Sequence, residues 1–481
     1  MPLIETRPIA VDLDGTLVRT DLLAECVSLF FIKNPIRFFK ILIWLFRGKS
    51  ILKIELANRF KLDASVLPYN VDLIEWLRAE KQSGRRLVLA TASHRVLAEQ
   101  VAQHLNLFDE VLATEGDTNL KSTSKAKALI ERFGESGFDY VGNDWPDLHV
   151  WAKAHTAHVV DPPASLLKLA KAQGNVGLVF YSGMPSKLTS TFKAMRLHQW
   201  MKNLLVFVPL IAAHQYVDIE RNIFALLAFI IFCLTASSVY ILNDLVDLQD
   251  DRHHLSKRNR PFASGGLSLI AGWGTWSILL LMASIFSILL MPLAFSVNLG
   301  VYLILTVAYS LQLKQFAVID VLLLAVLYTL RIIAGAVAID VPLSFWLLLF
   351  SMFIFLSLAL IKRYSELKVA RGSGKTGTLP GRGYQAEDLE LVSSLGGSSG
   401  FIAVLVLALY LQDGHAGHFY AKPHLIWLIC PVMLFWISRA WLIAHRGNMH
   451  DDPIVFALKD KVSWILGLIM LGVFALARVY S

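Results

Sequence analysis

The sequence predicts an α/β domain at the N-terminus followed by an all-α membrane domain of about nine transmembrane helices. Residues 1 to about 180 mix charged and apolar residues as soluble domains do, whereas apolar runs dominate from about Leu204 onward. Over 481 residues, hydrophobic residues make up 55% and charged residues 17%, and the mean hydropathy is +0.54. These values are typical of a membrane protein. A short apolar strand that begins at Ile9 opens the soluble part.

The change in composition falls in the polar stretch from Ser182 to Arg196. We therefore predict a soluble domain over residues 1–180 with a helical cap at about 18–84, a linker over 181–198, and a membrane domain over 199–481. The first residues lack a basic start followed by an apolar core, so we expect no signal peptide and a cytosolic soluble domain. The formal net charge of +8 does not indicate nucleic acid, because the soluble part has no basic stripe interleaved with aromatic residues.

Nine apolar segments are candidates for spanning helices, each of which needs about 20 residues. Their centres lie near Val208, Ile230, Met282, Ile304, Ala325, Met352, Leu405, Met433 and Ile469. Basic residues concentrate in the loops that follow even-numbered segments, whereas the opposite loops offer little beyond Arg221 and Lys422. The positive-inside rule then places those loops and the soluble domain on the cytosolic face of the inner membrane.

One apolar run in the soluble part, Ile41 to Phe46, is too short to span a membrane. Basic residues surround it, namely Lys33, Arg37, Lys40, Arg47 and Lys49. The run could lie on the membrane surface as an amphipathic helix. It could equally pack as part of a cap over an active site.

A cluster of carboxylates follows the second apolar segment. Asp244, Asp247 and Asp251 are spaced by three and four residues, so a continuing helix places them on one face. Carboxylates gathered at a membrane edge repel one another unless a cation joins them, and Mg²⁺ bridging to a diphosphate is the usual solution. Basic residues that could neutralise a leaving diphosphate follow at Arg252, Lys257, Arg258 and Arg260. The alternative is a solvated polar loop.

This segment resembles the NDxxDxxxD signature of the UbiA prenyltransferase superfamily, with Asn243 as its first residue. Most members carry a second aspartate-rich motif after the sixth span, where this chain has Lys362, Arg363 and Glu366 instead. In this departure the chain is similar to the branch of decaprenyl-phosphate phosphoribosyltransferase-like enzymes. Tyr309 and Lys314 are further features that are similar to that branch. The resemblance covers roughly residues 187–481.

The resemblance implies Mg²⁺-dependent transfer of 5-phosphoribose from phosphoribosyl diphosphate to a polyprenyl phosphate lipid. It also implies that Asp244 and Asp247 are catalytic, that Asp244, Asp247 and Asp251 hold the metal, and that the substrate phosphates meet cationic and polar side chains. Those substrate-binding residues are Asn243, Arg252, Lys257, Arg258, Arg260, Tyr309, Lys314, Arg331, Lys362, Arg363 and Glu366. Arg331 could instead form a structural ion pair with Asp320. Two competing functions are prenyl transfer to a small acceptor and transport with a regulatory phosphatase-like domain.

In the soluble part, Asp12 and Asp14 follow the first strand and lie on the same side of it. Asp12 could attack phosphorus while Asp14 protonates the leaving oxygen. The stretch resembles the DxDGT motif of haloacid-dehalogenase-like (HAD) phosphatases. The resemblance implies that Thr91 binds the phosphoryl group and that Lys125, with Lys121 as the alternate, is the motif lysine.

The fourth HAD motif departs from its usual GDxxxD form, because Asn143 stands where the first acid is expected. Asp144 could take the role of that acid beside Asp12, Asp14 and Asp147, or Mg²⁺ could be held by Asp12, the Asp14 carbonyl, Asp147 and the neutral Asn143. A cap over such a site favours a small phosphorylated head group, and the 5-phosphate of the lipid product is the expected substrate. The alternative is a degenerate fold that is kept only for interaction.

Overall fold

The structure is a computed structural model with two compact units, each described by itself below. It describes residues 7–33, 39–60, 62–115, 120–372, 382–412, 420, 422–449 and 453–479. The first unit comprises Met1–Met195 with Tyr240–Trp276, and the second comprises Arg196–Val239 with Ser277–Ser481. The predicted domain boundaries near residues 180 and 198 stay predictions.

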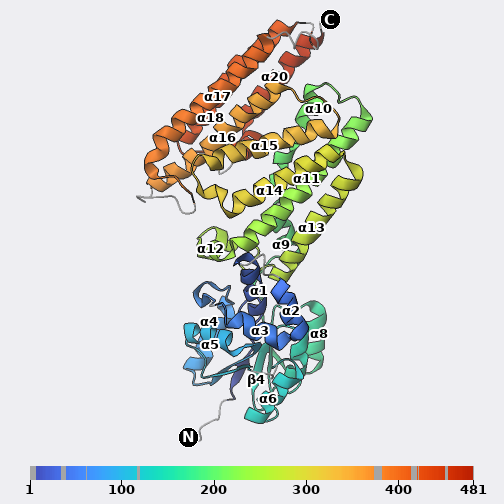
Figure 1. Cartoon of the computed structure of the whole chain (residues 1–481). Coiled ribbons are helices and arrows are strands. Elements are labelled where there is room, and N and C mark those ends of the chain that lie inside the picture. Colours follow the sequence, from blue (N-terminus) through green and yellow to red (C-terminus); the bar gives the residue numbers. More distant parts are fainter. Residues whose placement is uncertain are drawn as a thin grey trace. The chain divides into compact units, whose positions relative to one another are not determined.

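A six-stranded parallel sheet forms the centre of the first unit (Figure 1). Its strands lie in the order β3-β2-β1-β4-β5-β6, so the order reverses beside β1. In open α/β sheets, ligands bind beyond the carboxyl ends of the strands at such a reversal. The strands are β1 (Ile9–Val11), β2 (Leu87–His94), β3 (Glu110–Thr114), β4 (Asp139–Gly142), β5 (Ala157–Val160) and β6 (Val176–Phe180). The predicted α/β class is confirmed.

Apolar clusters cover both faces of this sheet. Successive side chains of a strand point to opposite faces, and accordingly Ile9 and Val11 join one buried cluster while Ala10 joins another. Burial on both faces explains why β1 is apolar without alternation. The helices that follow β2 along the chain are α5 (Arg95–Leu105), α6 (Thr123–Phe133), α7 (Leu148–Trp151), α8 (Ala164–Ala172) and α9 (Lys187–Met195).

The segment between β1 and β2 is helical, as expected for a cap. It contains α1 (Leu22–Lys33), α2 (Phe39–Arg47), α3 (Lys49–Ala57) and α4 (Val71–Gln82). Aromatic rings join α1, α2 and the segment after α3: Phe30 lies edge-on to Trp44 with centroids 5.3 Å apart, and edge-on to Phe60 at 6.1 Å. The same residues belong to the apolar cluster that covers β1 and β2.

Helix α2 contains the apolar run for which two positions were open. Ile41 and Trp44 are buried in the cap core, whereas Phe39, Ile43 and Phe46 are exposed. The helix therefore does pack as part of the cap, but only through one of its faces. Of the basic residues around it, Arg37 lies outside the described residues.

Eight helices in the described part of the chain are long and apolar enough to cross a membrane. They are α11 (Ile219–Val246), α13 (Leu269–Leu290), α14 (Leu293–Leu311), α15 (Ile319–Ala338), α16 (Phe345–Gly372), α17 (Leu389–Gln412), α18 (Ile429–His445) and α20 (Lys461–Val479). The ninth candidate, near Val208, is instead a 3₁₀ segment, Leu197–Phe207, followed by the short helix α10 (Val208–Ala212). The shorter elements of this part of the chain include α12 (Leu248–His253), the 3₁₀ segment Pro423–Leu428 and α19 (Pro453–Lys459). The protein is a multi-pass membrane protein.

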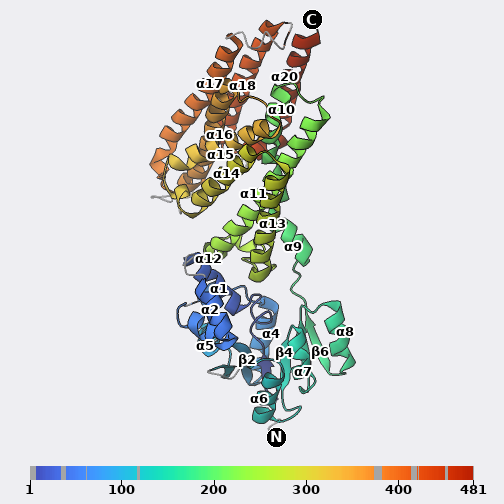
Figure 2. The ribbon, with the colours of Figure 1, turned by 45° about the vertical axis from the view of Figure 1, so that its right-hand side comes forward.

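Tight packing brings the 3₁₀ segment against α15 in the second unit. A Cβ on Gly335 would lie 2.0 Å from the carbonyl oxygen of Val206, closer than any side chain tolerates. Only glycine allows this approach. The buried residues Val206, Ala334 and Ala338 belong to one apolar cluster, which fixes the entry of the chain into the bundle. Figure 2 shows the same helices turned by 45°.

Candidate functional sites

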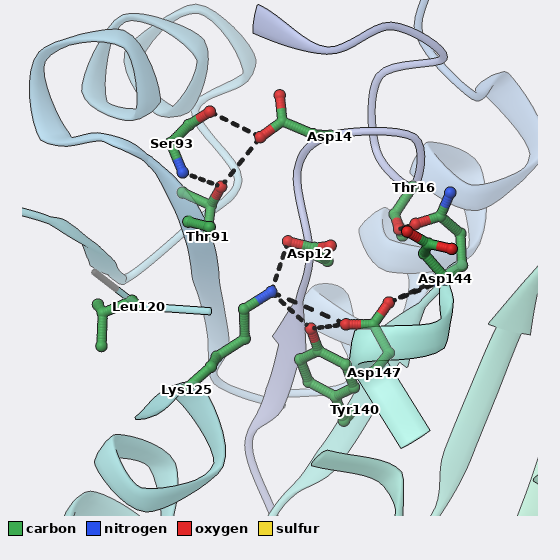
Figure 3. Close-up of polar contacts among 12 residues, drawn as sticks. Asp12, Asp14, Thr16, Thr91, Ser93, Leu120, Lys125, Tyr140, Asp144 and Asp147 are labelled. Carbon is green, nitrogen blue, oxygen red and sulfur yellow. Dashed lines mark hydrogen bonds and ion pairs between the residues drawn. The ribbon is translucent and has the colours of Figure 1, made fainter. Parts of the chain in front are cut away.

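Two aspartates leave the carboxyl end of β1 and point to different partners (Figure 3). Asp14 Oδ2 accepts hydrogen bonds from Ser93 Oγ at 2.6 Å and Thr91 Oγ1 at 3.4 Å. Its Oδ1 accepts from the backbone N–H of Leu22 at 2.8 Å, at the start of α1. Asp14 is therefore oriented by β2 and by the cap, away from the side chains that hold Asp12.

A buried lysine joins the second set of acids. Lys125 Nζ, near the start of α6, donates to Asp12 Oδ1 at 2.7 Å and lies 3.9 Å from Asp147 Oδ1. The alternate lysine, Lys121, is exposed. This geometry supports Lys125 as the motif lysine.

Tyr140, on β4, connects the lysine to the acid of the fourth motif. Its hydroxyl accepts from Lys125 Nζ at 2.8 Å and donates to Asp147 Oδ1 at 2.9 Å. Asp147 Oδ2 accepts from the backbone N–H groups of Asn143 and Asp144, so Asp147 is buried and fixed. Asp144 is exposed and its carboxylate accepts from the N–H of Trp145. Asp147 is thus better placed than Asp144 to face Asp12.

The residue that replaces the motif acid also faces this site. Asn143 Oδ1 accepts from Thr16 Oγ1 at 3.1 Å. A Cβ on Gly15 would lie 2.3 Å from Asn143 Nδ2, and Gly15 has a φ of 77°. The turn after β1 therefore needs glycine both for its backbone conformation and for the side chain of Asn143.

The electrostatics of this site suit a cation. Burial raises the pKa of Asp12 to about 7, although Lys125 opposes the shift, and burial raises the pKa of Asp14 to about 6. Burial lowers the pKa of Lys125, but Asp12 and Asp147 outweigh it and raise that pKa above its usual value. The single positive charge of Lys125 thus faces two carboxylates, those of Asp12 and Asp147, and cannot neutralise both. An all-oxygen set of Asp12, the Asp14 carbonyl, Asp147 and Asn143 matches what Mg²⁺ prefers.

Two residues of this site were not predicted as functional. Ser93 holds the carboxylate of Asp14, and Tyr140 lies between Lys125 and Asp147. Ser93 follows Thr91 by two residues on a strand, so the same-face alternation of strands was the available signal. Tyr140 carries no such signal, because its position inside β4 resembles that of any buried aromatic residue.

The carboxylate cluster runs from the last turn of α11, which contains Asn243 and Asp244, through Asp247 into α12, which contains Asp251. The N–H of Asp247 donates to the carbonyl of Asn243 and the N–H of Asp251 to the carbonyl of Asp247, each at 2.8 Å. Arg260 Nη1 lies 3.1 Å from Asp244 Oδ1 and 2.6 Å from Asp251 Oδ2. Asp244 and Asp251 therefore meet on an arginine from the following loop, whereas the role of Asp247 stays a prediction.

Two oxygen atoms in this cluster suit a metal ion. Asn243 Oδ1 and Asp251 Oδ1 are buried acceptors without a hydrogen-bond partner among the described residues. Burial raises the pKa of Asp251, although Arg260 opposes the shift. No group of three or more His, Cys, Asp or Glu side chains over the described ranges is already arranged to hold a metal ion. A magnesium site here would therefore need Arg260 to move aside or to bind the diphosphate together with the metal.

The other basic residues near this cluster differ in exposure. Lys257 and Arg258 are exposed on a 3₁₀ turn, Lys257–Asn259. Arg252 is buried and donates two hydrogen bonds to Glu25. Arg252 was predicted to bind substrate, but its guanidinium is directed at a carboxylate of the cap helix instead.

In the second unit, the segment predicted to bind anions contains a buried ion pair. Arg363 is fully buried, with Nε 2.9 Å from Asp320 Oδ2, and it also pairs with Glu366. The hydroxyl of Tyr384 donates to Asp320 Oδ1 at 2.8 Å. The charge of Arg363 is thus matched by protein acids, which is not what we expected for a residue that binds phosphate. Lys362, beside it, is half-buried.

The remaining predicted residues lie in polar surroundings. Arg331 donates to Asn203 Oδ1 and to the hydroxyl of Tyr302, each at 2.9 Å, so the alternative of a pair with Asp320 is not what the structure shows. The hydroxyl of Tyr309 accepts from Arg382 Nη1 at 2.9 Å. Lys314 is half-buried on the turn between α14 and α15.

Comparison with known proteins assigns both halves of the chain. The profile of the UbiA prenyltransferase family matches residues 204–459, more than half of the chain. The chain belongs to the UbiA prenyltransferase family. The profile of the haloacid dehalogenase-like hydrolases matches residues 9–136, which contain Asp12, Thr91 and Lys125. The recognition of both families from their motifs is confirmed.

Several relatives are similar over most of their length. The "Uncharacterized protein y4nM" of Sinorhizobium fredii is 35% identical, over 98% of this chain and 91% of that protein. The "Decaprenyl-phosphate phosphoribosyltransferase" of Mycolicibacterium smegmatis is 32% identical over 62% of this chain and 96% of its own length. A solved UbiA homologue from Archaeoglobus fulgidus has a TM-score of 0.45 and 16% identity, over 60% of this chain and 97% of that one.

The protein is therefore a UbiA-family transferase fused to a HAD hydrolase-like domain. Both families generally use Mg²⁺, which agrees with the oxygen-rich sites described above. The relatives include proteins named decaprenyl-phosphate phosphoribosyltransferase from Mycolicibacterium smegmatis and Mycobacterium tuberculosis.

Proposed function

We propose that the protein transfers 5-phosphoribose from phosphoribosyl diphosphate to a polyprenyl phosphate, in a Mg²⁺-dependent reaction at the cytosolic face of the inner membrane. We further propose that the HAD-like domain removes the 5-phosphate of the lipid product. The observation that carries the proposal is that Asp244 and Asp251 both pair with the Arg260 guanidinium, together with the absence of a second aspartate-rich motif from the sequence.

The single carboxylate cluster suits a donor with a single diphosphate. Mg²⁺ held by Asp244, Asp247 and Asp251 would supply charge neutralisation for the leaving diphosphate. Exposed Lys257 and Arg258 can bind further phosphate oxygens. The chain needs no general base for this reaction, because the acceptor phosphate is already an anion. Its residues mainly hold the acceptor oxygen in line with C1 of the ribose and stabilise the charge that leaves.

The HAD-like site has the groups that phosphate-ester hydrolysis requires. Asp12 attacks phosphorus, the leaving oxygen takes a proton from Asp14, and water then cleaves the acyl phosphate on Asp12. Lys125 favours the ionised form of Asp12 against the effect of burial and would compensate the charge of the phosphoryl group. Thr91 is positioned by β2 to bind that group. Mg²⁺ on Asp12, the Asp14 carbonyl and Asp147 would supply charge compensation to the phosphoryl oxygens.

A fused phosphatase acts at high effective concentration on the lipid that the transferase makes. The similarity to decaprenyl-phosphate phosphoribosyltransferases, at 31% to 32% identity over at least 90% of their length, supports the substrates. The test is mass spectrometry of the lipids formed from polyprenyl phosphate and labelled phosphoribosyl diphosphate by the purified protein. A labelled polyprenyl-phosphoryl ribose is expected, and label that stays in the aqueous phase would refute the proposal.

The competing function is prenyl transfer from a prenyl diphosphate to an aromatic or other small acceptor, as the family name suggests. The same assay decides, with a prenyl diphosphate offered as donor in a parallel reaction. Release of diphosphate only from the prenyl donor would establish the competitor.

A further inference from the structure

The cap of the HAD-like domain and the aspartate-rich segment of the transferase share a buried ion pair within the first unit. Arg252 Nη2 lies 2.6 Å and Nη1 3.1 Å from the two carboxylate oxygens of Glu25. Their side chains are 2% and 0% exposed. A bidentate pair removed from water in this way fixes the geometry of the two elements that carry it. Figures 1 and 2 both show α1 beside α12.

Further contacts around this pair satisfy its remaining groups and extend the interface. Thr20 Oγ1 donates to Glu25 Oε1 at 2.8 Å, and Arg252 Nε donates to the carbonyl of Ala263 at 3.3 Å. A Cβ on Gly265 would lie 2.6 Å from Cβ of Arg19, so the loop after α12 packs closely against the cap. The Glu25–Arg252 pair and the close approach of Gly265 to Arg19 each join residues more than two hundred positions apart in the chain.

The pair sits next to the groups that the transfer reaction needs. Arg252 directly follows Asp251, whose carboxylate meets Arg260. In the same first turn of α1, the N–H of Leu22 donates to Asp14 of the phosphatase site. One helix of the cap therefore contacts both the general acid of one site and the residue beside a metal-binding carboxylate of the other.

We propose that α1 is a structural support of the transferase site, with Glu25 as the positioning residue that holds Asp251 through Arg252. Arg252 then serves this support and does not bind the diphosphate. The HAD-like domain would be required for transfer even when its own hydrolytic activity is not. The kinetic part of this proposal rests on the proposed function.

The experiment compares wild type, Glu25→Met, Arg252→Met and the double variant Glu25→Met/Arg252→Met as full-length proteins in nanodiscs. Either single change leaves one charge buried without its partner, whereas replacing both by apolar residues of similar length is often tolerated. We expect each single variant to lose about tenfold or more in transfer rate, because misplaced catalytic groups are costly. We expect the double variant to recover most of the wild-type rate. Glu135→Met is the control, because Glu135 is exposed and pairs with Lys153 on the surface.

Two outcomes would overturn the proposal. Wild-type transfer by Glu25→Met would show that the pair does not support the site. A double variant as slow as Arg252→Met would show that Arg252 touches substrate. Amide hydrogen exchange over residues 247–263 gives an independent measurement, with faster exchange expected in the single variants only. If wild type transfers no phosphoribose, the proposed function fails, but the exchange measurement still tests the support.

A second inference comes from the outer face of α2. Phe39, Ile43 and Phe46 are 72%, 51% and 91% exposed and follow the i, i+4, i+7 spacing of a single helix face. Exposed Lys40 and Arg47 flank this face. An apolar stripe with basic neighbours is the pattern of helices that lie in the plane of an acidic membrane surface.

The position of the preceding helix supports this partner. Phe31, near the end of α1, packs edge-on against Trp273 with ring centroids 4.6 Å apart. Trp273 and Trp276 lie in the first turns of α13, a candidate spanning helix, where aromatic residues mark the membrane interface. α2 follows α1 in the chain, so the exposed stripe begins close to the level of that interface.

We propose that α2 rests on an acidic bilayer through Phe39, Ile43 and Phe46. The test places nitroxide labels at Ile43→Cys and Phe46→Cys in the full-length protein in nanodiscs with acidic lipid. Val71→Cys and Leu169→Cys are matched controls, because these apolar residues of α4 and α8 are also exposed. Collisions with oxygen should exceed those with a water-soluble nickel complex at 43 and 46, and the reverse should hold at the controls. Equal accessibility at all four positions, or spin–spin broadening that reveals a second copy, would overturn the proposal.

Discussion

The two aspartate-rich sites of this protein solve the same electrostatic problem with different architecture. In the HAD-like site, acids from the ends of β1 and β4 meet Lys125 from the start of α6. In the transferase site, Asp244 at the end of α11 and Asp251 in the adjoining α12 meet Arg260 from the next loop. Carboxylates that must approach one another need a cation in both cases. The first site depends on long-range folding, whereas the second is largely encoded locally.

This difference decides how each site should respond to mutation. The HAD-like acids are held by side chains from several elements, so removing a reactive group should leave the site assembled. The transferase acids depend on their own helix and on the elements that hold it. The variants below separate reactive groups from groups that hold the structure.

The largest effect is expected for Asp12→Asn. It removes the nucleophile, so hydrolysis should fall by about 10⁴-fold. Transfer should continue, because Asp12 takes no part in it, and polyprenyl-phosphoryl-5-phosphoribose should accumulate. Mass spectrometry detects the difference of one phosphate. If wild type and variant yield the same phosphorylated lipid and hydrolyse no other phosphate ester, the HAD-like domain is kept only for interaction.

In the transferase site, Asp244→Asn or Asp247→Asn should reduce transfer by about 100-fold or more, because each removes a negatively charged metal ligand. The proteins should remain folded in detergent, with phosphatase activity as the internal control. Increasing Mg²⁺ should restore part of the rate if affinity for the metal is what was lost. Near-normal turnover in either variant would argue against the metal–diphosphate site.

The adjacent pair Lys362 and Arg363 should give contrasting results. Arg363→Ala leaves Asp320 buried without its partner, which costs about 3 to 5 kcal/mol and should lower the melting temperature sharply. Lys362→Ala should leave stability unchanged and raise the KM for a phosphorylated substrate about tenfold. Thermal unfolding and steady-state kinetics on both variants distinguish the two roles. An unchanged KM in Lys362→Ala would mean that the segment binds no substrate.

The sequence was sufficient where the information is local. The three- and four-residue spacing of Asp244, Asp247 and Asp251 already predicts one helix face, and the run of apolar segments predicts the membrane helices. The prediction of a spanning helix near Val208 failed, because the chain there forms a 3₁₀ segment, Leu197–Phe207, followed by the short helix α10.

Contacts between distant residues could not be predicted in this way. Nothing in the pattern around Arg252 indicates Glu25, and nothing around Arg363 indicates Asp320, because charge pairing depends on which helices meet. Both arginines stand in segments whose family resemblance points to substrate phosphates. A cationic side chain serves either purpose, and only the positions of the acids tell the two apart.

The smallest effect is expected for Ser93→Ala, and its sign follows from the hydrogen bond to Asp14. Burial raises the pKa of Asp14 to about 6, and the Ser93 hydroxyl opposes that shift because it donates to the ionised carboxylate. Removing the hydroxyl should raise this pKa further, by about one unit for a hydrogen bond to a charged group. Asp14 must be protonated to act as the general acid, so the variant should keep its phosphatase activity to higher pH.

The measurement is the basic limb of the pH profile of kcat for a soluble phosphate ester. Thr189→Ala is the control and should leave that limb in place, because the Thr189 hydroxyl is exposed on α9 and hydrogen-bonds Ser186. A downward shift in Ser93→Ala would mean that Asp14 acts in its ionised form.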